Sequence, residues 1–149
     1  GFVELVYVAG TLHDVGKIGV PDAVLKKQER LDDAEFAQIK LHPELGEKIV
    51  RQIPQLKDTL PGIRHHHEQF DGKGYPDGLA GEEISLLARI LAVADTFDAM
   101  TSDRPYRKGL PHEVALAEIE RGAGTQFDPV LAHKFIELMR DSTENPLAA

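Results

Sequence analysis

Histidine and aspartate recur in this chain inside stretches that are otherwise apolar. His13 and Asp14 end an apolar stretch that begins at Phe2, and Asp95 directly follows the run ILAVA. An unpaired carboxylate in such surroundings costs on the order of several kcal/mol, so each of these acids needs a cation beside it. Imidazole and carboxylate groups suit iron, manganese or zinc. Because the chain has no cysteine, any metal ion must be held through nitrogen and oxygen.

A run of three histidines at 65–67 is followed by an acid and a glycine-rich turn, in the stretch HHHEQFDGKGYP. Its internal position argues against an affinity tag, which lies at a terminus. The residues alone leave two interpretations open, surface histidines or metal ligands. A lone buried histidine or aspartate is more often a hydrogen-bonded structural residue, and His42, directly before a proline, is typical of a loop. The recurrence of the same two residue types favours ligands.

An adjacent histidine and aspartate can serve one metal ion or two. Neighbouring residues on a helix point about 100° apart, so His13 and Asp14 can supply two donors to one ion, or Asp14 can bridge two ions. His66 and His67 can likewise serve two adjacent ions. Two ions roughly 3.5–4 Å apart form the arrangement that hydrolyses phosphate esters. Lys17 lies one turn after His13, where it can meet a phosphate oxygen.

The elements that must position these residues are predicted to be helices. The apolar residues have helical periodicity nearly throughout, and no stretch alternates long enough to predict a strand. Asp32 or Asp33 is the predicted N-cap of one helix, and Pro61 is expected in the first turn of another. The helices at 2–14 and 84–102 are expected to be buried. Helices are predicted over 2–14, 32–53 (two stretches divided at Pro43), 56–69, 84–102, 112–122 and 129–141.

Length and charge limit the class of protein. The 149 residues are enough for about one domain, and we expect a single all-α domain over 1–149. The net charge of −8 argues against broad binding to nucleic acid. There is no apolar run near the ~18 residues that span a bilayer and no signal peptide, so no membrane association and a cytoplasmic location are expected.

One segment departs from the acidic balance. In SDRPYRK, Arg104, Arg107 and Lys108 against Asp103 give a local charge of +2. Such a patch suits a dianionic substrate, and planar arginine can also stack on a base. The alternative is a solvated helix end. For DGKGYP the alternative is a simple surface turn.

Several long motifs occur in a fixed order along the chain: LHDVGKIGVPD, KLHPELGEKI, HHEQFDGKGYPDGLAGEEI, ARILAVADTFDAMTSDRPYRKG and AGTQFDP. Together they resemble the HD-GYP domain, a branch of the HD phosphohydrolases, over about residues 9–138. A lone HD pair would be weak evidence, whereas the long motifs around GYP and after Asp95 are highly specific. The resemblance implies a helical bundle with a metal cluster in its core and a GYP loop at the edge of the substrate groove.

The resemblance also implies an activity and a set of residues that carry it. The activity is hydrolysis of cyclic di-GMP, a bacterial second messenger, to pGpG and onward to GMP, with two divalent metal ions or three, commonly iron or manganese. The implied metal ligands are His13, Asp14, His42, His66, His67 and Asp95, with His65 a bystander. The implied catalytic residues are His13, Asp14 and Lys17. The implied substrate-binding residues are Lys17, Gly74, Tyr75, Pro76, Asp98, Arg104 and Arg107.

One departure from the family pattern concerns the start of the chain. Members normally carry a further helix before the HD helix, with another histidine and, in trinuclear members, a glutamate. This chain begins twelve residues before His13, so we expect it to be truncated on its N-terminal side, without that helix and without a sensory or receiver domain of the parent protein.

Two alternative functions stay open. One is a catalytically weak or inactive signalling module that binds cyclic di-GMP, or protein partners through the GYP loop. The other is an HD phosphohydrolase for another cyclic dinucleotide or a nucleotide. The intact HD pair, Lys17 and GYP favour the phosphodiesterase. Whether the chain forms a homodimer is left open.

Overall fold

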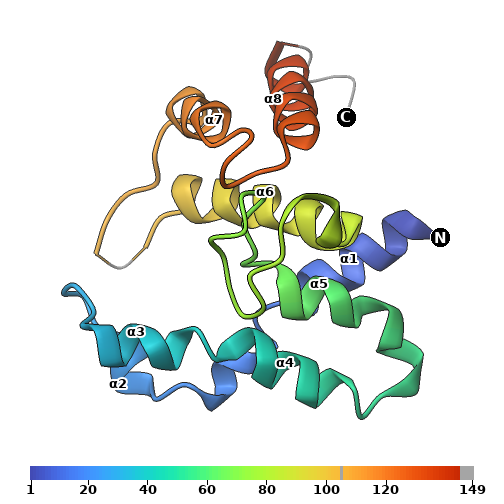
Figure 1. The fold of residues 1–149 in the computed structure, drawn as a ribbon. Helices are drawn as coiled ribbons and strands as arrows, with labels where there is room; N and C mark the ends of the chain where they lie inside the picture. The colour runs from blue at the N-terminus through green and yellow to red at the C-terminus, as the bar shows by residue number, and fades with distance from the viewer. Residues whose placement is uncertain (105, 145–149) are drawn as a thin grey trace.

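One central helix divides this all-helical chain into two packed groups. The computed structural model describes residues 1–104 and 106–144, and in it α6 (Leu86–Thr101) crosses the middle of the molecule (Figure 1). On one side, α7 (His112–Arg121) and α8 (Pro129–Glu144) pack against α6. On the other side lie α1 (Phe2–Leu12), α4 (His42–Val50) and α5 (Leu60–His65). The remaining elements are η1 (Val15–Gly19), α2 (Asp22–Leu25), α3 (Asp33–Ile39), η2 (Pro54–Thr59) and η3 (Gly81–Glu83).

The larger hydrophobic core lies between α6, α7 and α8. Its buried members are Val93, Phe97, Ala115, Leu116, Ile119, Phe127, Ala132 and Ile136. A smaller cluster joins α1 to α6 through Ala9, Leu87 and Leu91. The two clusters use different faces of α6, so this helix ties both groups together.

A close approach of two backbones brings the ends of α1 and α4 together. A Cβ atom at Gly16 would lie 1.8 Å from the carbonyl oxygen of His42 and 2.5 Å from the nitrogen of Gly46. Only glycine lets η1 lie this close to α4. The contact places Asp14, just before η1, beside His42 at the start of α4.

The predicted fold class is confirmed. In the described part of the chain the only β pairings are isolated bridges, and Pro61 lies in the first turn of α5 as predicted. Asp32 is the N-cap of α3, because its carboxylate accepts the backbone N–H of Glu35 at 2.8 Å. The predicted division at Pro43 is shifted: the break falls at Lys40 and Leu41, and His42 begins α4. Proline is tolerated in a first helical turn, so it need not exclude the residue before it.

The predicted burial of two helices is wrong in part. In α1 only Ala9 is buried, while Val3 is 82% exposed and Tyr7 76% exposed. In α6 Leu86 is 44% exposed, although Leu87 next to it is buried. Apolar composition reports the residue types, whereas burial depends on which neighbouring elements cover each face. No helix in the described residues is long and apolar enough to cross a membrane.

Candidate metal centre

Three histidines are oriented in the same way by the backbone. In each, the ring Nδ1 donates to the carbonyl oxygen three residues earlier: His13 to Gly10 at 2.5 Å, His42 to Ile39 at 2.6 Å and His66 to Ile63 at 2.7 Å. A carbonyl oxygen can only accept, so Nδ1 carries the proton. Nε2 of each ring is then turned toward the site, which is the arrangement found in metal-ligating histidines.

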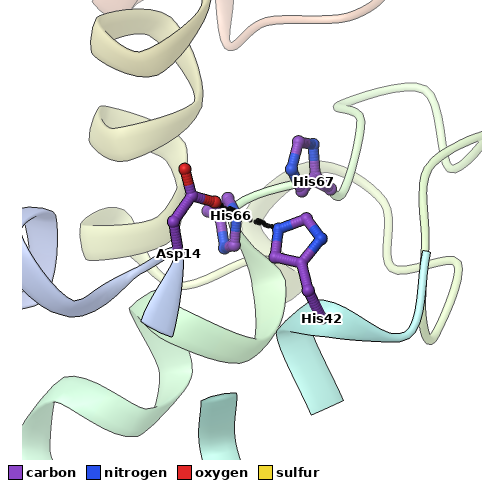
Figure 2. A group of neighbouring side chains, drawn as sticks. All are labelled: Asp14, His42, His66 and His67. Atoms are coloured by element: carbon purple, nitrogen blue, oxygen red, sulfur yellow. Dashed lines mark hydrogen bonds and ion pairs between the residues drawn. The ribbon is translucent and has the colours of Figure 1, made fainter. Parts of the chain in front are cut away.

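Acceptor atoms face one another around Asp14 (Figure 2). Nε2 of His42 lies 3.2 Å from Nε2 of His66 and 3.2 Å from Oδ1 of Asp14, and Nε2 of His66 lies 3.7 Å from the same oxygen. In a neutral imidazole ring whose Nδ1 carries the proton, Nε2 has a lone pair and no proton to donate. Oδ1 of Asp14 is buried and receives no hydrogen bond. Three acceptor atoms within 3.7 Å of one another fit a cation between them.

A second group of donors lies on the other side of Asp14. Nε2 of His13 is 3.0 Å from Oδ1 of Asp95 and 3.3 Å from Oδ2 of Asp14. Burial works against a charge on His13, but hydrogen bonds to Asp14 and Asp95 outweigh it and raise the pKa of His13 to about 10. Burial likewise opposes ionisation of Asp14, and the surrounding imidazoles still hold its pKa below the usual range.

The two groups share Asp14. One consists of Asp14, His42, His66 and His67 and the other of His13, Asp14 and Asp95, and within each group the ligand atoms lie within 4.8 Å of one another. Oδ1 of Asp14 faces the first group and Oδ2 the second. The structure therefore brings all six predicted ligands together, in an arrangement that fits two ions bridged by one carboxylate.

His67 is oriented differently from the other three histidines of the centre. Its ring lies 4.2 Å from that of His66 and stacks on Tyr75, with centroids 5.0 Å apart and planes at 14°. Burial, together with the neighbouring His66 and His42, lowers the pKa of His67 to about 3. The ring is therefore neutral at physiological pH and able to act as a ligand.

His65 points away from this centre. Its Nε2 donates to Oδ2 of Asp77 at 2.7 Å, and His65, Glu68 and Asp77 form a third group of close ligand atoms. The carboxylates of that group already have partners: Asp77 is paired with Arg64, and Glu68 accepts backbone N–H groups. These carboxylates are therefore already engaged within the protein, and His65 lies outside both sets around Asp14.

The GYP loop packs directly on the metal centre. A Cβ atom at Gly74 would lie 2.3 Å from the nitrogen of Gln69, so the loop lies flat on the backbone that follows the histidines. The backbone N–H of Tyr75 donates to the carbonyl oxygen of His67 at 3.2 Å. Nζ of Lys40 lies 5.1 Å from the centroid of the Tyr75 ring. Gly74, Tyr75 and Pro76 are each half-buried, and their contact with substrate stays a prediction.

Lys17 and Asp98 lie beside the centre. Nζ of Lys17 donates to Oδ2 of Asp14 at 2.9 Å, and this lysine side chain is 42% exposed. Asp98 borders a cavity of about 250 Å³ that is also lined by His13 and Asp95. Its carboxylate accepts the hydroxyl of Ser102 at 3.0 Å. Contact of either residue with substrate stays a prediction.

The two arginines of the basic segment have different surroundings. Nη2 of Arg107 donates to the carbonyl oxygen of Ala99 at 2.7 Å, which holds this side chain against the last turns of α6. Arg104 is exposed and borders a cavity of about 460 Å³ with Tyr106. Leu25, Lys26 and Gln28 also line that cavity. Arg104 thus faces open space, whereas Arg107 supports the loop.

Sequence reasoning assigns no role to Arg64, Glu68 or Asp77, which hold the GYP loop. Glu68 is buried at 3% exposure and follows the histidine run directly. An acid at that place, just before a glycine-rich loop with many backbone N–H groups, is the one signal in the sequence. The pairing of Arg64 with Asp77 leaves no such signal, because the two residues are thirteen positions apart.

Comparison with known proteins identifies related chains. The model of the HD domain family matches residues 3–131. A cyclic di-GMP phosphodiesterase of Pseudomonas aeruginosa is 44% identical over 131 residues, covering 87% of this chain and 31% of that protein. A cyclic di-GMP phosphodiesterase of Thermotoga maritima is 41% identical over 145 residues, covering 96% and 39%. A 3′3′-cGAMP-specific phosphodiesterase of Vibrio cholerae is 43% identical over 121 residues, covering 81% and 26%.

A solved structure shares the fold. The crystal structure of the V. cholerae cyclic GMP-AMP phosphodiesterase V-cGAP3 superposes with a TM-score of 0.62 at 22% identity, over 92% of this chain and 38% of that one. This chain spans between 26% and 39% of the length of the three relatives above.

Proposed function

The chain belongs to the HD domain family, in its HD-GYP form, and from this premise we propose that it is a metal-dependent phosphodiesterase domain for cyclic dinucleotides. The observation that carries the proposal is the convergence of unprotonated acceptors on Asp14, where Nε2 of His42 and Nε2 of His66 face a buried oxygen that has no donor. Such an arrangement is stabilised by a cation.

The donor chemistry fits two divalent ions. His13, Asp14 and Asp95 would hold one, and Asp14, His42, His66 and His67 the other. Nitrogen and oxygen donors without thiolate suit iron or manganese, which we propose as the resident metals. Paired divalent ions of this kind activate water and stabilise negative charge on phosphoryl oxygens.

Lys17 supplies a second source of positive charge. Its Nζ lies at Oδ2 of Asp14 and is part-exposed, so a short movement brings it to a phosphate oxygen at the centre. During attack on phosphorus, charge grows on the non-bridging oxygens, and a lysine aimed at them stabilises the transition state more than the bound substrate. We expect Arg104, which borders an open cavity, to bind a more remote phosphate or base.

Cyclic di-GMP is the proposed substrate, with pGpG and then GMP as products. Relatives with 36–44% identity are named as cyclic di-GMP phosphodiesterases. The second candidate is 3′3′-cGAMP, because a 43% identical relative is named as specific for it. Both carry two phosphodiesters and a purine pair, so the same centre serves either.

For the whole protein we propose a regulatory partner domain. The matched relatives are longer than this chain, and one that is 44% identical is named as the response regulator RpfG of Xanthomonas campestris. A sensory or receiver domain would then control access to the centre. Protein partners at the GYP loop are a further proposal, supported by the exposed position of Lys73 and Asp77 on that loop.

Metal content and turnover together test the proposed function. We expect two bound ions per chain by elemental analysis, and hydrolysis of cyclic di-GMP or 3′3′-cGAMP followed by chromatography. Asp14→Ala should lose both ions and Asp95→Ala one, while His65→Ala should keep both. A metal-loaded chain that binds these nucleotides without cleaving them would overturn the proposal in favour of a binding module.

A further inference from the structure

One guanidinium joins three segments that surround the metal centre. Arg64 lies on α5, directly before the histidine run. Its Nη1 donates to Oε2 of Glu47 on α4 at 2.7 Å. Its Nε and Nη2 donate to the two oxygens of Asp77, after the GYP motif, at 2.8 and 2.9 Å. The paired contact with Asp77 uses the planar fork of arginine, which a lysine cannot reproduce.

The loop residue held by this fork is fixed from a second side. Glu68, almost fully buried, accepts the backbone N–H of Asp77 at 2.6 Å, of Gly78 at 3.1 Å and of Leu79 at 3.0 Å. Both the backbone and the side chain of Asp77 are therefore held. Two residues before Asp77, the ring of Tyr75 lies on His67.

The orientation of the His67 ring depends on the GYP loop, whereas the other three histidines of the centre are oriented by backbone carbonyl groups. His13, His42 and His66 are each oriented by a hydrogen bond from Nδ1 to a backbone carbonyl. Within residues 1–104 and 106–144 no hydrogen bond reaches the ring of His67, and its stacking partner is Tyr75, at 14° between the planes. Packing therefore orients the ring: it lies 4.2 Å from the ring of His66 and 5.0 Å from that of His42, and the loop supplies the stacked face through Tyr75.

These contacts form one line from Arg64 through Asp77 and Tyr75 to His67. We propose that Arg64 is a positioning residue, which fixes the GYP loop and thereby orients His67 as a ligand in one of the two metal sites. The inference rests on the proposed function, because it assumes that the groups around Asp14 hold ions. Loss of Arg64 should therefore lower the metal affinity of the site formed by His42, His66 and His67. The metal affinity of the site formed by His13 and Asp95 should not change.

Arg51 provides a matched control on the same acid. It also pairs with Glu47, one turn earlier on α4, but its side chain is 63% exposed, and among the described residues its hydrogen bond and ion pair go to Glu47 alone. If Arg64 acted only by neutralising Glu47, loss of Arg51 would have a similar effect. If it acts through the loop, the two variants differ.

The experiment is a calorimetric titration of Mn²⁺ into the metal-free chain, with elemental analysis of the loaded protein. For Arg64→Lys we expect one of two sites to weaken by roughly 10–100-fold, the range found when a group that orients a ligand is lost, and the other to keep its affinity. Arg51→Ala should bind as wild type. Tyr75→Leu should reproduce Arg64→Lys, and the double variant should be no weaker than Tyr75→Leu alone, since both act along one line.

One further variant and the wild type separate the outcomes. Asp77→Asn removes the loop end of the fork without changing its shape, so it replaces Arg64→Lys if that chain fails to fold by circular dichroism. Two unchanged sites in both variants, or equal weakening of the two sites, would overturn the inference. A wild-type chain that binds no Mn²⁺ would instead overturn the proposed function.

Discussion

At the scale of single residues, the protonated ring nitrogen of each histidine determines which nitrogen is available to a metal ion. The rings of His42 and His66 carry their protons on Nδ1 and offer lone pairs to the interior. His13 differs, because its Nε2 lies between Asp14 and Asp95 and holds a proton there in the metal-free chain. A proton therefore occupies the position that one metal ion would take, so metal binding and protonation compete at His13.

The first prediction is that metal binding releases this proton. The pKa of His13 is raised to about 10, so the ring is charged at pH 7, and an ion bound at Nε2 must displace about one proton per chain. Affinity at this site should rise by up to roughly tenfold per pH unit until the pH nears 10. Calorimetry in buffers of different ionisation enthalpy measures the release, and His65→Ala, outside the centre, should leave it unchanged.

The same shift sets how metal-free stability depends on pH. The folded-state pKa of His13 lies above the ordinary histidine value of 6.5. The contribution of the charged ring to the stability of the metal-free chain is thus complete below pH 6.5 and is lost as the pH rises through about 10.

Metal affinity without pH dependence between pH 7 and 9 would contradict this description of His13.

The second prediction concerns Lys17 and the rate of the reaction. Lys17→Ala should lower kcat by roughly 10²–10³-fold with a small change in KM, because the ammonium stabilises charge that develops only in the transition state. The assay is steady-state hydrolysis of cyclic di-GMP by the metal-loaded chain. Lys48→Ala, an exposed lysine on α4, is the control. A raised KM with kcat unchanged would reduce Lys17 to a docking cation.

At the scale of elements, the site depends on two segments that approach closely without side chains between them. Gly16 in η1 lies against the carbonyl of His42, and this contact sets the spacing of Asp14 and His42. The sequence alone does not reveal this contact, because a glycine in VGKIG is equally typical of a turn. Only the folded structure shows that the backbone of α4, and not solvent, occupies the space where a side chain of residue 16 would lie.

The third prediction follows from that contact. Gly16→Ala should destabilise the chain by roughly 3 kcal/mol or more, since the added methyl meets backbone atoms that cannot rotate away. It should also weaken Mn²⁺ binding by separating Asp14 from His42. Gly10→Ala is the matched control on α1: its Cβ atom would meet only Leu91 Cδ2, at 3.5 Å, and alanine favours a helix. Urea unfolding measures both, and equal stabilities would contradict the proposed role of the contact.

The sequence predicted elements better than it predicted their surroundings. Helical periodicity located α3 and α4, and the cap at Asp32 follows from a local pattern that needs no tertiary contact. The exposure of Val3 and Tyr7 on α1 was missed, because periodicity does not say which faces other elements cover. Long motifs identified Asp14 and the five residues around it, whereas Arg64 and Asp77 meet through the fold and show no pattern in the sequence.

At the scale of the whole molecule, the two groups of helices have different sources of stability. The α6, α7 and α8 side has a continuous apolar core. The side that includes α1, α4 and α5 places acceptor atoms and a carboxylate at its centre, with a smaller apolar cluster against α6. Bound ions would therefore stabilise mainly this second side, since without them its lone pairs repel one another.

The last prediction is that chelation destabilises one side of the molecule first. An ion present at 100 times its dissociation constant adds about 2.7 kcal/mol, so removing the metal should lower Tm by roughly 5–10 °C for a chain of this size, and Mn²⁺ should restore it. Hydrogen exchange should quicken in α4 and α5 before α7 and α8. Asp14→Ala, which removes the carboxylate shared by both groups of ligands, should show a Tm that no longer responds to Mn²⁺. Verified metal loss with an unchanged Tm would mean that the acceptors around Asp14 are stable without a cation.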